Sequence, residues 1–218
     1  MVVSNVIAYV QITSSIALRA GVVQACYNAV RHEITRPAVS IVTDFIPETL
    51  TLRDHTELVL RGLHPADQER IQAFFHHLSA ESVFYRILEY RTMITPDEAR
   101  QLCDMDGQNR VALAAVQPTD SGEAILAVAR YSVISPADPA TAEAAIVVAD
   151  AYQRRGLGTL MIQRLRQYAV AHGIRQFIAT VHPNNHQILR FIDRGGLRME
   201  RQLADGLWEI KIHLDPAG

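Results

Sequence analysis

The residues whose types and spacing most clearly suggest chemistry are a pair of arginines and a pair of glycines in the stretch QRRGLGT, residues 153–159. An apolar run precedes this stretch and a helical pattern follows it. A turn of this kind presents unpaired backbone N–H groups and the positive end of a helix, which together attract an anion. The glycines allow a phosphate to approach the backbone, and Arg154 and Arg155 add charge at the rim. An ordinary turn with solvated arginines is the alternative.

Two common phosphate-binding motifs do not fit this stretch. The dinucleotide motif G-x-G-x-x-G would need a third glycine at position 161, which is Met. The P-loop motif would need Gly-Lys-Ser or Gly-Lys-Thr, which the stretch lacks. The remaining pattern is Gln-x-x-Gly-x-Gly, formed by Gln153, Gly156 and Gly158.

One carboxylate upstream of the glycines is a candidate general base. Glu143 lies in AEAAIVVAD, residues 142–150, where its neighbours are apolar. Burial would raise its pKa, which suits the removal of a proton from a primary amine. The extended chain from Glu143 to Ala149 spans roughly 20 Å, so an acyl group on a long arm could reach it from the glycines. A solvent-facing strand end is the alternative, and Glu123, which borders a turn, is a rival base.

The elements that must position these residues follow from the periodicity of apolar residues. Several glycines and prolines mark the turns between them, including Asp205–Gly206 as a hairpin turn. The predicted strands are residues 56–63, 110–116, 123–134, 142–150, 175–181, 197–203 and 207–214. The predicted helices are residues 64–79, 95–102, 157–172 and 184–194.

The composition predicts a cytoplasmic globular protein. The chain has 218 residues, 49% of them hydrophobic, and a formal net charge of −2, which argues against nucleic acid and membrane surfaces as partners. Cys26 and Cys103 are far apart and are expected to be reduced. The first eighteen residues lack charged side chains, but they are too polar for a membrane span and lack a basic signal region. Residues 1–50 are therefore predicted to be an N-terminal extension of unknown role.

Taken with these elements, the Gln-x-x-Gly-x-Gly pattern resembles the pyrophosphate loop of the GNAT acyltransferase superfamily. The resemblance covers about residues 50–214 and implies a GNAT domain over residues 51–218. The implied fold is α/β (α+β), with a mixed, mainly antiparallel central sheet of about six to seven strands flanked by about four helices. The co-substrate would be acetyl-CoA, with no metal. Its pyrophosphate would bind the backbone N–H groups of Arg155, Gly156, Leu157, Gly158 and Thr159.

The same resemblance implies further cofactor contacts. The pantetheine arm would pair with the backbone of Val147, Val148 and Ala149, whose side chains belong to the core. Asn185 would contact the cofactor, although a helix N-cap explains this asparagine equally well. Many members carry a tyrosine seven residues later as general acid, but this position is Ile192. Water or another group would then protonate the thiolate, or catalysis would be weak.

The first half of the predicted domain resembles the Pat-type bacterial protein lysine acetyltransferases. In that group a turn written lrdG precedes a strand, and the next helix ends in the pattern F-x-x-L-S-x-E-S-x-y-x-R. His55 replaces the glycine of the turn. The residues that match the helix pattern are Leu78, Ser79, Glu81, Ser82 and Arg86. The resemblance implies that Glu143 is the catalytic residue of the AE-x-A-x-x-V strand, and Pat-type sequences usually also lack the tyrosine.

The leading hypothesis is an acetyl-CoA-dependent N-acetyltransferase that acts by direct transfer, with Glu143 as base and residues 153–159 as the cofactor clamp. The acceptor would be a protein lysine or else a small-molecule amine, and a homodimer is compatible with the sequence. The alternative is a non-catalytic acyl-CoA-binding sensor or partner module, against which the presence of Glu143 argues. His182, His186, His76 and His77 have no paired acid or metal-ligand spacing, so surface or packing roles are expected.

Overall fold

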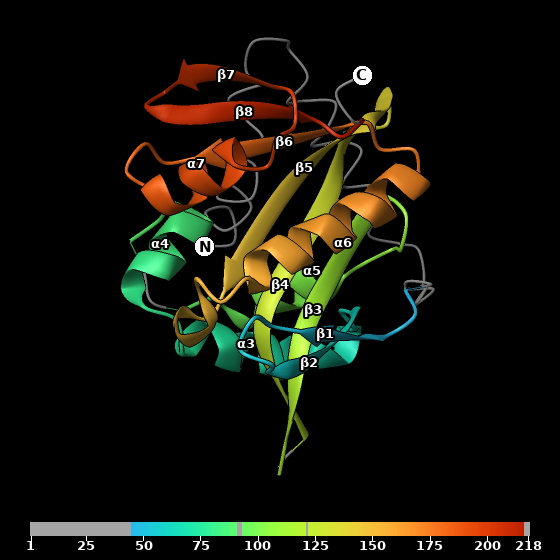
Figure 1. Ribbon diagram of the computed structural model, residues 1–218, viewed down its shortest axis with the longest axis vertical. Coiled ribbons are helices and arrows are strands. Elements are labelled where there is room, and N and C mark those ends of the chain that lie inside the picture. Colours follow the sequence, from blue (N-terminus) through green and yellow to red (C-terminus); the bar gives the residue numbers. More distant parts are fainter. Residues whose placement is uncertain (1–44, 91–92, 121, 216–218) are drawn as a thin grey trace.

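The computed structural model describes residues 45–90, 93–120 and 122–215, which form an eight-stranded sheet and five α-helices (Figure 1). The order of strands is β1-β2-β3-β4-β5-β6-β8-β7. All neighbouring strands are antiparallel except β5 and β6, which are parallel. The predicted mixed, mainly antiparallel sheet is confirmed, with slightly more strands and helices than expected.

Short connections join the elements along the chain. The strands are β1 (Glu48–Thr51), β2 (Glu57–Gly62), β3 (Arg110–Thr119), β4 (Gly122–Ser135), β5 (Asp138–Val148), β6 (Gln176–Val181), β7 (Met199–Ala204) and β8 (Leu207–His213). The helices are α3 (Gln68–His76), α4 (Ala80–Ile87), α5 (Pro96–Cys103), α6 (Leu157–Ala171) and α7 (His186–Asp193). Two short 3-10 segments are η1 (Pro65–Asp67) and η2 (Asp150–Tyr152).

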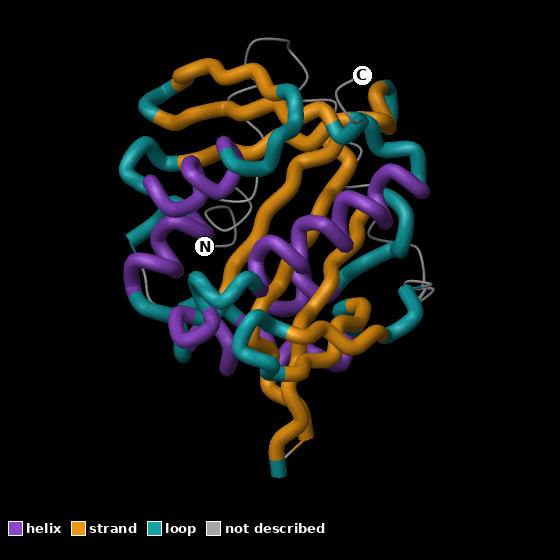
Figure 2. The backbone as a smooth tube through the Cα atoms, in the orientation of Figure 1, coloured by secondary structure: helices purple, strands orange, loops and turns teal. Residues whose placement is uncertain are grey.

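Helices cover both faces of the centre of the sheet (Figures 1 and 2). In β3, Leu113 and Ala115 join a buried cluster with α6, whereas Ala112 and Ala114 join a second cluster with α3 and α5. Successive side chains of a strand point to opposite faces, so a strand covered on both faces is apolar throughout. A smaller third cluster forms between α7 and strands β6 to β8.

Local sequence signals explain where several elements begin and turn. Thr95 caps α5, because its hydroxyl accepts the N–H of Glu98 at 3.2 Å and the Glu98 carboxylate accepts the N–H of Thr95 at 2.7 Å. Asp205 and Gly206 have φ of 52° and 79° and join β7 to β8, as the predicted hairpin turn requires. These signals were readable without the tertiary structure.

The structure shortens the helix predicted over residues 64–79 and adds a helix directly after it. α3 ends at His76, and α4 begins at Ala80 after Ser79, whose backbone is extended. The Ser79 hydroxyl accepts the N–H of Ser82 at 3.2 Å, which caps the first turn of α4. Ser79, the last residue of the predicted helix, therefore caps a further helix that was not predicted.

The N-terminal region contributes one strand to the described part of the chain. β1 pairs antiparallel with β2 and begins three residues before the predicted domain start at residue 51. Most of the predicted extension, residues 1–44, lies outside the described residues, and so does Cys26. The role of the extension stays a prediction. Cys103 is a free thiol in the buried core.

Candidate functional site

The candidate site lies where two neighbouring strands separate. β5 and β6 share three residue pairs, and the last pair joins Glu143 to Ile178. Beyond this point β5 continues to Val148 beside β4, and β6 continues to Val181 beside β8. The two strands therefore diverge, as Figure 1 shows. Within the described sheet, the edge of β5 that faces β6 has no ladder partner over residues 144–148.

The alternation of the strand decides which backbone groups face this open edge. The Ala149 N–H donates to the Leu126 carbonyl of β4 at 2.8 Å, so it points away from β6. Successive residues direct their N–H and C=O groups to opposite sides. Val148 and Ile146 therefore direct theirs to the open edge. Of the three residues predicted to pair with an extended ligand, Val148 faces the edge, whereas Val147 and Ala149 face β4.

Glu143 lies at the point of divergence and is half-buried. Burial raises the pKa of its carboxyl above the ordinary value of 4.5, and the positive charges of Arg86 in α4 and Arg130 in β4 partly oppose this shift. A carboxylate with a raised pKa accepts a proton more readily near neutral pH than an ordinary surface carboxylate does. The geometry thus places the predicted base at the inner end of the open edge.

The rival carboxylate, Glu123, lies elsewhere in the molecule. It forms an ion pair with Arg61, with 2.7 Å between Glu123 Oε2 and Arg61 Nη2. Glu143 is opposite Ser132 on β4, so the two carboxylates are nine residues, or about 30 Å, apart along that strand. Glu123 therefore helps to hold the β3–β4 hairpin against β2 and is remote from the point of divergence.

The predicted glycine turn leads from β5 into α6. Gly156 is the N-cap of α6 with φ of 94°, a left-handed conformation that favours glycine, and no side chain caps the helix. In the described part of the chain, no acceptor takes the backbone N–H groups of Arg155, Gly156, Leu157 or Gly158. The Thr159 N–H, in contrast, donates to the Gly156 carbonyl at 3.1 Å. Four of the five predicted N–H groups are thus available to an anion.

The second glycine of the motif has a different environment from the first. A methyl group added to Gly158 would lie 3.7 Å from Val148 Cγ2 and 3.8 Å from Ile146 Cδ1, which is ordinary van der Waals contact. Gly158 has no left-handed backbone angle. Its side-chain position therefore points towards β5, where the structure has room for a methyl group.

The two arginines of the turn differ in their partners. The Arg155 Nε–H donates to Asp54 Oδ2 at 2.7 Å, and Arg155 Nη2 donates to Thr56 Oγ1 at 2.7 Å. The guanidinium also lies 4.5 Å from the centre of the Tyr152 ring. Arg154 is exposed, with φ of 60°. The charge of Arg155 is therefore engaged by the β1–β2 turn, while that of Arg154 faces solvent.

A hydrogen-bond network that the sequence reasoning missed fixes the start of the turn. Asp150 accepts the Ser79 N–H and the hydroxyls of Ser79 and Ser82 at 2.7–2.8 Å. Burial acts to raise the pKa of Asp150, but these hydrogen bonds outweigh it and lower that pKa. Gln153 Nε2 donates to Ser82 Oγ at 3.2 Å and to the Val148 carbonyl at 3.1 Å. Gln153 thus joins β5 to α4, and the serines of the Pat-like pattern were the available signal.

The residues after β6 border the open edge from the other side. Asn185 is the N-cap of α7, since its Oδ1 accepts the Ile188 N–H at 3.2 Å. Ile192, which stands where the resemblance implies a general-acid tyrosine, is 9% exposed and packs in the cluster between α7 and strands β6 to β8. His182 accepts the Asn184 N–H at 3.1 Å through Nδ1. His182 also lies beside aromatic residues of α4, with ring centres 5.4 Å from Phe84. The contacts of Asn185, Ile192 and His182 thus hold α7 and its preceding loop in place.

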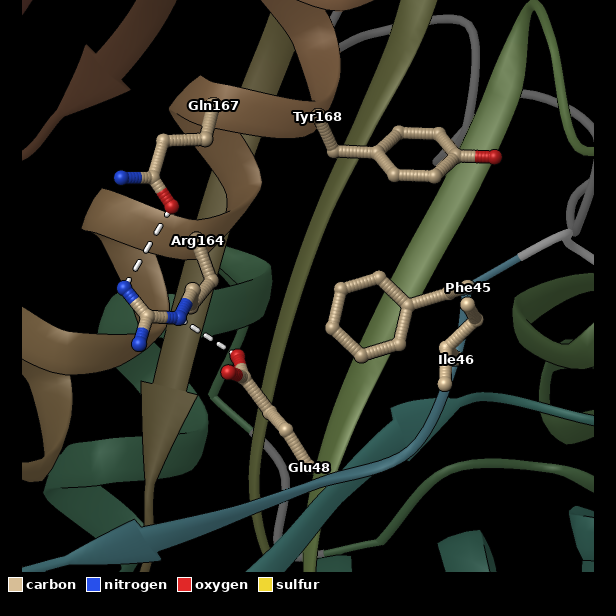
Figure 3. A pocket seen from close by; sticks show the side chains of 6 residues that line it. All are labelled: Phe45, Ile46, Glu48, Arg164, Gln167 and Tyr168. Atoms are coloured by element: carbon tan, nitrogen blue, oxygen red, sulfur yellow. Dashed lines mark hydrogen bonds and ion pairs between the residues drawn. The ribbon is translucent and has the colours of Figure 1, made fainter.

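The rest of the described chain was compared with three other kinds of feature: a metal site, a membrane-spanning helix and a surface pocket. Residues 45–90, 93–120 and 122–215 contain no group of three or more His, Cys, Asp or Glu side chains arranged for a metal ion. No helix among them has the length and apolar character needed to cross a membrane. One surface pocket lies between β1 and α6 (Figure 3) and contains none of the predicted site residues. Its lining residues are Phe45, Ile46, Glu48, Arg164, Gln167 and Tyr168.

Comparison with known proteins agrees with this architecture. A sequence model of the acetyltransferase (GNAT) family matches residues 72–196, more than half of the chain. An acetyltransferase from Pseudomonas aeruginosa is 29% identical over 126 residues, which are 58% of this chain and 67% of that protein.

Solved structures show the same fold. The GNAT domain of S. lividans PAT is similar with a TM-score of 0.70 and 28% identity, covering 77% of this chain and 96% of that domain. The structure of yncA from Salmonella typhimurium with its cofactor acetyl-CoA has a TM-score of 0.53 and 21% identity. This second likeness covers 75% of the present chain and 97% of the other, and it concerns the fold.

Proposed function

The chain belongs to the acetyltransferase (GNAT) family, and we propose that it moves the acetyl group of acetyl-CoA directly to a primary amine. GNAT members transfer acetyl groups from acetyl-CoA; the assignment of individual residues and of the acceptor is the proposal. The observation that carries it is the position of Glu143 at the last shared pair of β5 and β6, between the open edge of β5 and the charged helix α4.

The open edge and the glycine turn together fit the shape of acetyl-CoA. The pyrophosphate binds the N–H groups of residues 155–158 at the start of α6, where no protein acceptor in the described chain competes. The pantetheine arm extends along β5 and pairs with backbone groups of Val148 and Ile146, which face the open edge. The thioester then lies near Glu143, because the strand from residue 143 to residue 149 spans roughly 20 Å.

The chemical step is a direct transfer. Glu143 accepts a proton from the acceptor ammonium, directly or through a water molecule, so that the neutral amine can attack the thioester carbonyl carbon. The new C–N bond forms as the C–S bond breaks, the attacking nitrogen releases its second proton to water, and CoA leaves as the thiolate. Water supplies the proton to that thiolate, because Ile192 has no group that could donate one.

The acceptor that we favour is a protein lysine. The support is the likeness to Pat-type domains in the α3–α4 region, including the serines that bind Asp150, and the 28% identity to the S. lividans PAT domain. A small-molecule amine is the other acceptor within the same proposal.

The test is the substitution Glu143→Gln, which keeps the size of the side chain and removes the base. We expect turnover, measured as free thiol release from acetyl-CoA in the presence of amines, peptides and cell protein, to fall by about 10²- to 10⁴-fold. The dissociation constant for acetyl-CoA, measured by calorimetry, should stay nearly the same, because the cofactor contacts are backbone groups.

The matched control is Glu123→Gln, which removes the rival carboxylate about 30 Å along the sheet and should leave turnover per folded molecule unchanged. Wild-type turnover in the Glu143→Gln variant would remove this residue from the role of base. Binding of acetyl-CoA by the wild type with no thiol release against any acceptor would instead indicate an acyl-CoA-binding module that does not catalyse transfer.

A further inference from the structure

The β1–β2 turn, residues 52–56, brings a second arginine to the start of α6. If Gly156 carried a methyl group, that group would lie 3.5 Å from Arg53 Nε, 3.6 Å from Cγ and 3.8 Å from Cδ. The Arg53 side chain therefore lies beside the position where Gly156 lacks a side chain. Residues about one hundred positions apart in the sequence meet here, and the G-x-G pattern alone does not reveal the contact.

The turn is held in this position by several interactions. The Leu52 N–H donates to the Thr56 carbonyl at 2.9 Å, and the His55 N–H donates to the Leu52 carbonyl at 3.0 Å. His55 has φ of 64°, the left-handed conformation that the glycine of the Pat-like turn would adopt easily. Asp54 fixes the turn to the glycine motif by its ion pair with Arg155. Hydrogen bonds from Thr56, aided by Arg155, lower the pKa of Asp54, so it stays ionised at neutral pH.

The two arginines near the turn, Arg155 and Arg53, differ in whether a carboxylate pairs with them. Asp54 neutralises Arg155, which acts as the anchor of the turn. Arg53 is exposed and has no ion pair or hydrogen bond within the described residues. An arginine that lies beside unpaired N–H groups at a helix N-terminus is placed to bind the same anion as those groups. The sequence led us to assign the rim charge to Arg154 and Arg155; in the structure Asp54 engages Arg155, and Arg53 is a further arginine at this rim.

We propose that Arg53 is a binding residue for the diphosphate of the cofactor, which it contacts from the β1–β2 turn while residues 155–158 contact it from the start of α6. This inference rests on the proposed function, because it assumes that the diphosphate of acetyl-CoA occupies the glycine turn. Gly156 adopts the left-handed backbone angle that forms this turn, and the stem of Arg53 lies at ordinary contact distance from its side-chain position.

The test compares the affinity of Arg53→Ala and wild type for CoA and for 3′-dephospho-CoA by calorimetry. Loss of a charge-assisted contact to phosphate should raise both dissociation constants by the same factor, about ten- to a hundredfold. Arg53→Lys, which keeps the charge but not the fork of donors, should lose less. The unfolding midpoint of each variant should match the wild type, since Arg53 is exposed.

The matched control is Arg175→Ala. Arg175 is also exposed, and it lies beyond the far end of α6, about 22 Å from Gly156 at 1.5 Å per helical residue. It should leave both dissociation constants unchanged, which excludes a general effect of net charge.

Three outcomes would overturn the proposal. Dissociation constants of Arg53→Ala within about twofold of the wild type for both ligands would remove Arg53 from the site, with the proposed function intact. A loss for CoA but none for 3′-dephospho-CoA would move the contact to the 3′-phosphate. Failure of the wild-type protein to bind either ligand would overturn the proposed function itself.

Discussion

At the scale of single residues, the chemistry of this protein depends on one carboxylate and its surroundings. Glu143 is half-buried where β5 leaves β6, so burial disfavours its charged form. Arg86 and Arg130 supply positive charge that limits this effect. A base needs both influences: its pKa must rise towards the working pH, and its ionised form must still be populated.

The raised pKa of Glu143 predicts how its substitution affects stability at different pH values. The native state binds the proton of this carboxyl more tightly than the unfolded state does. Protonation therefore contributes stability that is complete below the ordinary pKa of 4.5 and is lost as the pH rises through the raised native pKa. Glu143→Gln, which mimics the protonated form, should be more stable than the wild type at pH 8, and this difference should shrink as the pH falls towards 5.

Urea unfolding of both proteins between pH 5 and pH 8 measures this difference. Glu123→Gln, which removes an acid in an ion pair with Arg61, should not show the same gain at high pH. A Glu143→Gln variant that is less stable than the wild type at pH 8 would contradict the assignment of a raised pKa.

At the scale of elements, the two glycines of the motif between β5 and α6 differ in what the structure requires of them. Gly156 adopts the left-handed angle, which favours glycine, and its side-chain position lies at ordinary contact distance from Arg53. Gly158 lies within α6 and faces Val148 and Ile146 at ordinary contact distance. The motif therefore has a backbone requirement at Gly156, whereas the position of Gly158 has room for a methyl group.

This division predicts opposite results for two alanine substitutions. Gly156→Ala should lower the free energy of unfolding by about 1–2 kcal/mol, because the left-handed angle is strained for a residue with a Cβ. It should also weaken acetyl-CoA binding. Gly158→Ala should leave the free energy of unfolding unchanged or raise it by up to about 1 kcal/mol, since alanine is the better helix former.

Chemical unfolding and calorimetry of the two variants give the comparison. Equal destabilisation by both substitutions would contradict the separate roles. The same holds for a Gly158→Ala variant that loses acetyl-CoA binding as severely as Gly156→Ala does.

At the scale of the whole molecule, a charge network around the buried Asp67 joins strand β2 to η1, α3 and β4. Asp67 in η1 is 1% exposed and binds Arg61 of β2 through both guanidinium ends, at 2.7 and 2.9 Å. It also accepts the His64 N–H at 2.9 Å and pairs with Arg70 of α3 at 3.0 Å. Glu123 of β4 binds the other side of Arg61. The network fixes α3 and the β3–β4 hairpin relative to β2.

Removing the charge of Asp67 should destabilise the fold as a whole. Asp67→Asn leaves Arg61, which is 11% exposed, with one carboxylate fewer in a buried site, so we expect a loss of about 3–5 kcal/mol in the free energy of unfolding. Asp215→Asn, in an exposed pair with Arg175, should cost less than about 1 kcal/mol. Urea unfolding at neutral pH measures both, and similar losses would contradict the structural role of the buried network.

The pH dependence of the Asp67 contribution has the opposite sign to that of Glu143. Burial acts to raise the pKa of Asp67, but its bonds to Arg61 outweigh burial, and the pKa is lowered. The stability it contributes is present above the ordinary pKa of the unfolded state and is lost as the pH falls through the lowered native value.

Local patterns determined much of this protein in advance. The apolar periodicity predicted seven of the eight strands in their order along the chain, and capping residues such as Thr95 marked helix starts. The isolated acid Glu143 and the glycine motif were visible because each breaks the pattern of its surroundings. Such signals act within a few residues, so the sequence carries them directly.

Only the tertiary structure decided which of these groups face one another. The point where β5 and β6 diverge depends on how many residue pairs the two strands share. The backbone groups of Val148 face the open edge of β5 because the Ala149 N–H donates to the Leu126 carbonyl of β4. The engagement of Arg155 by Asp54 and the contact of Arg53 with Gly156 join residues about one hundred positions apart. Periodicity and spacing cannot encode such contacts, because they arise from the packing of elements that are distant along the chain.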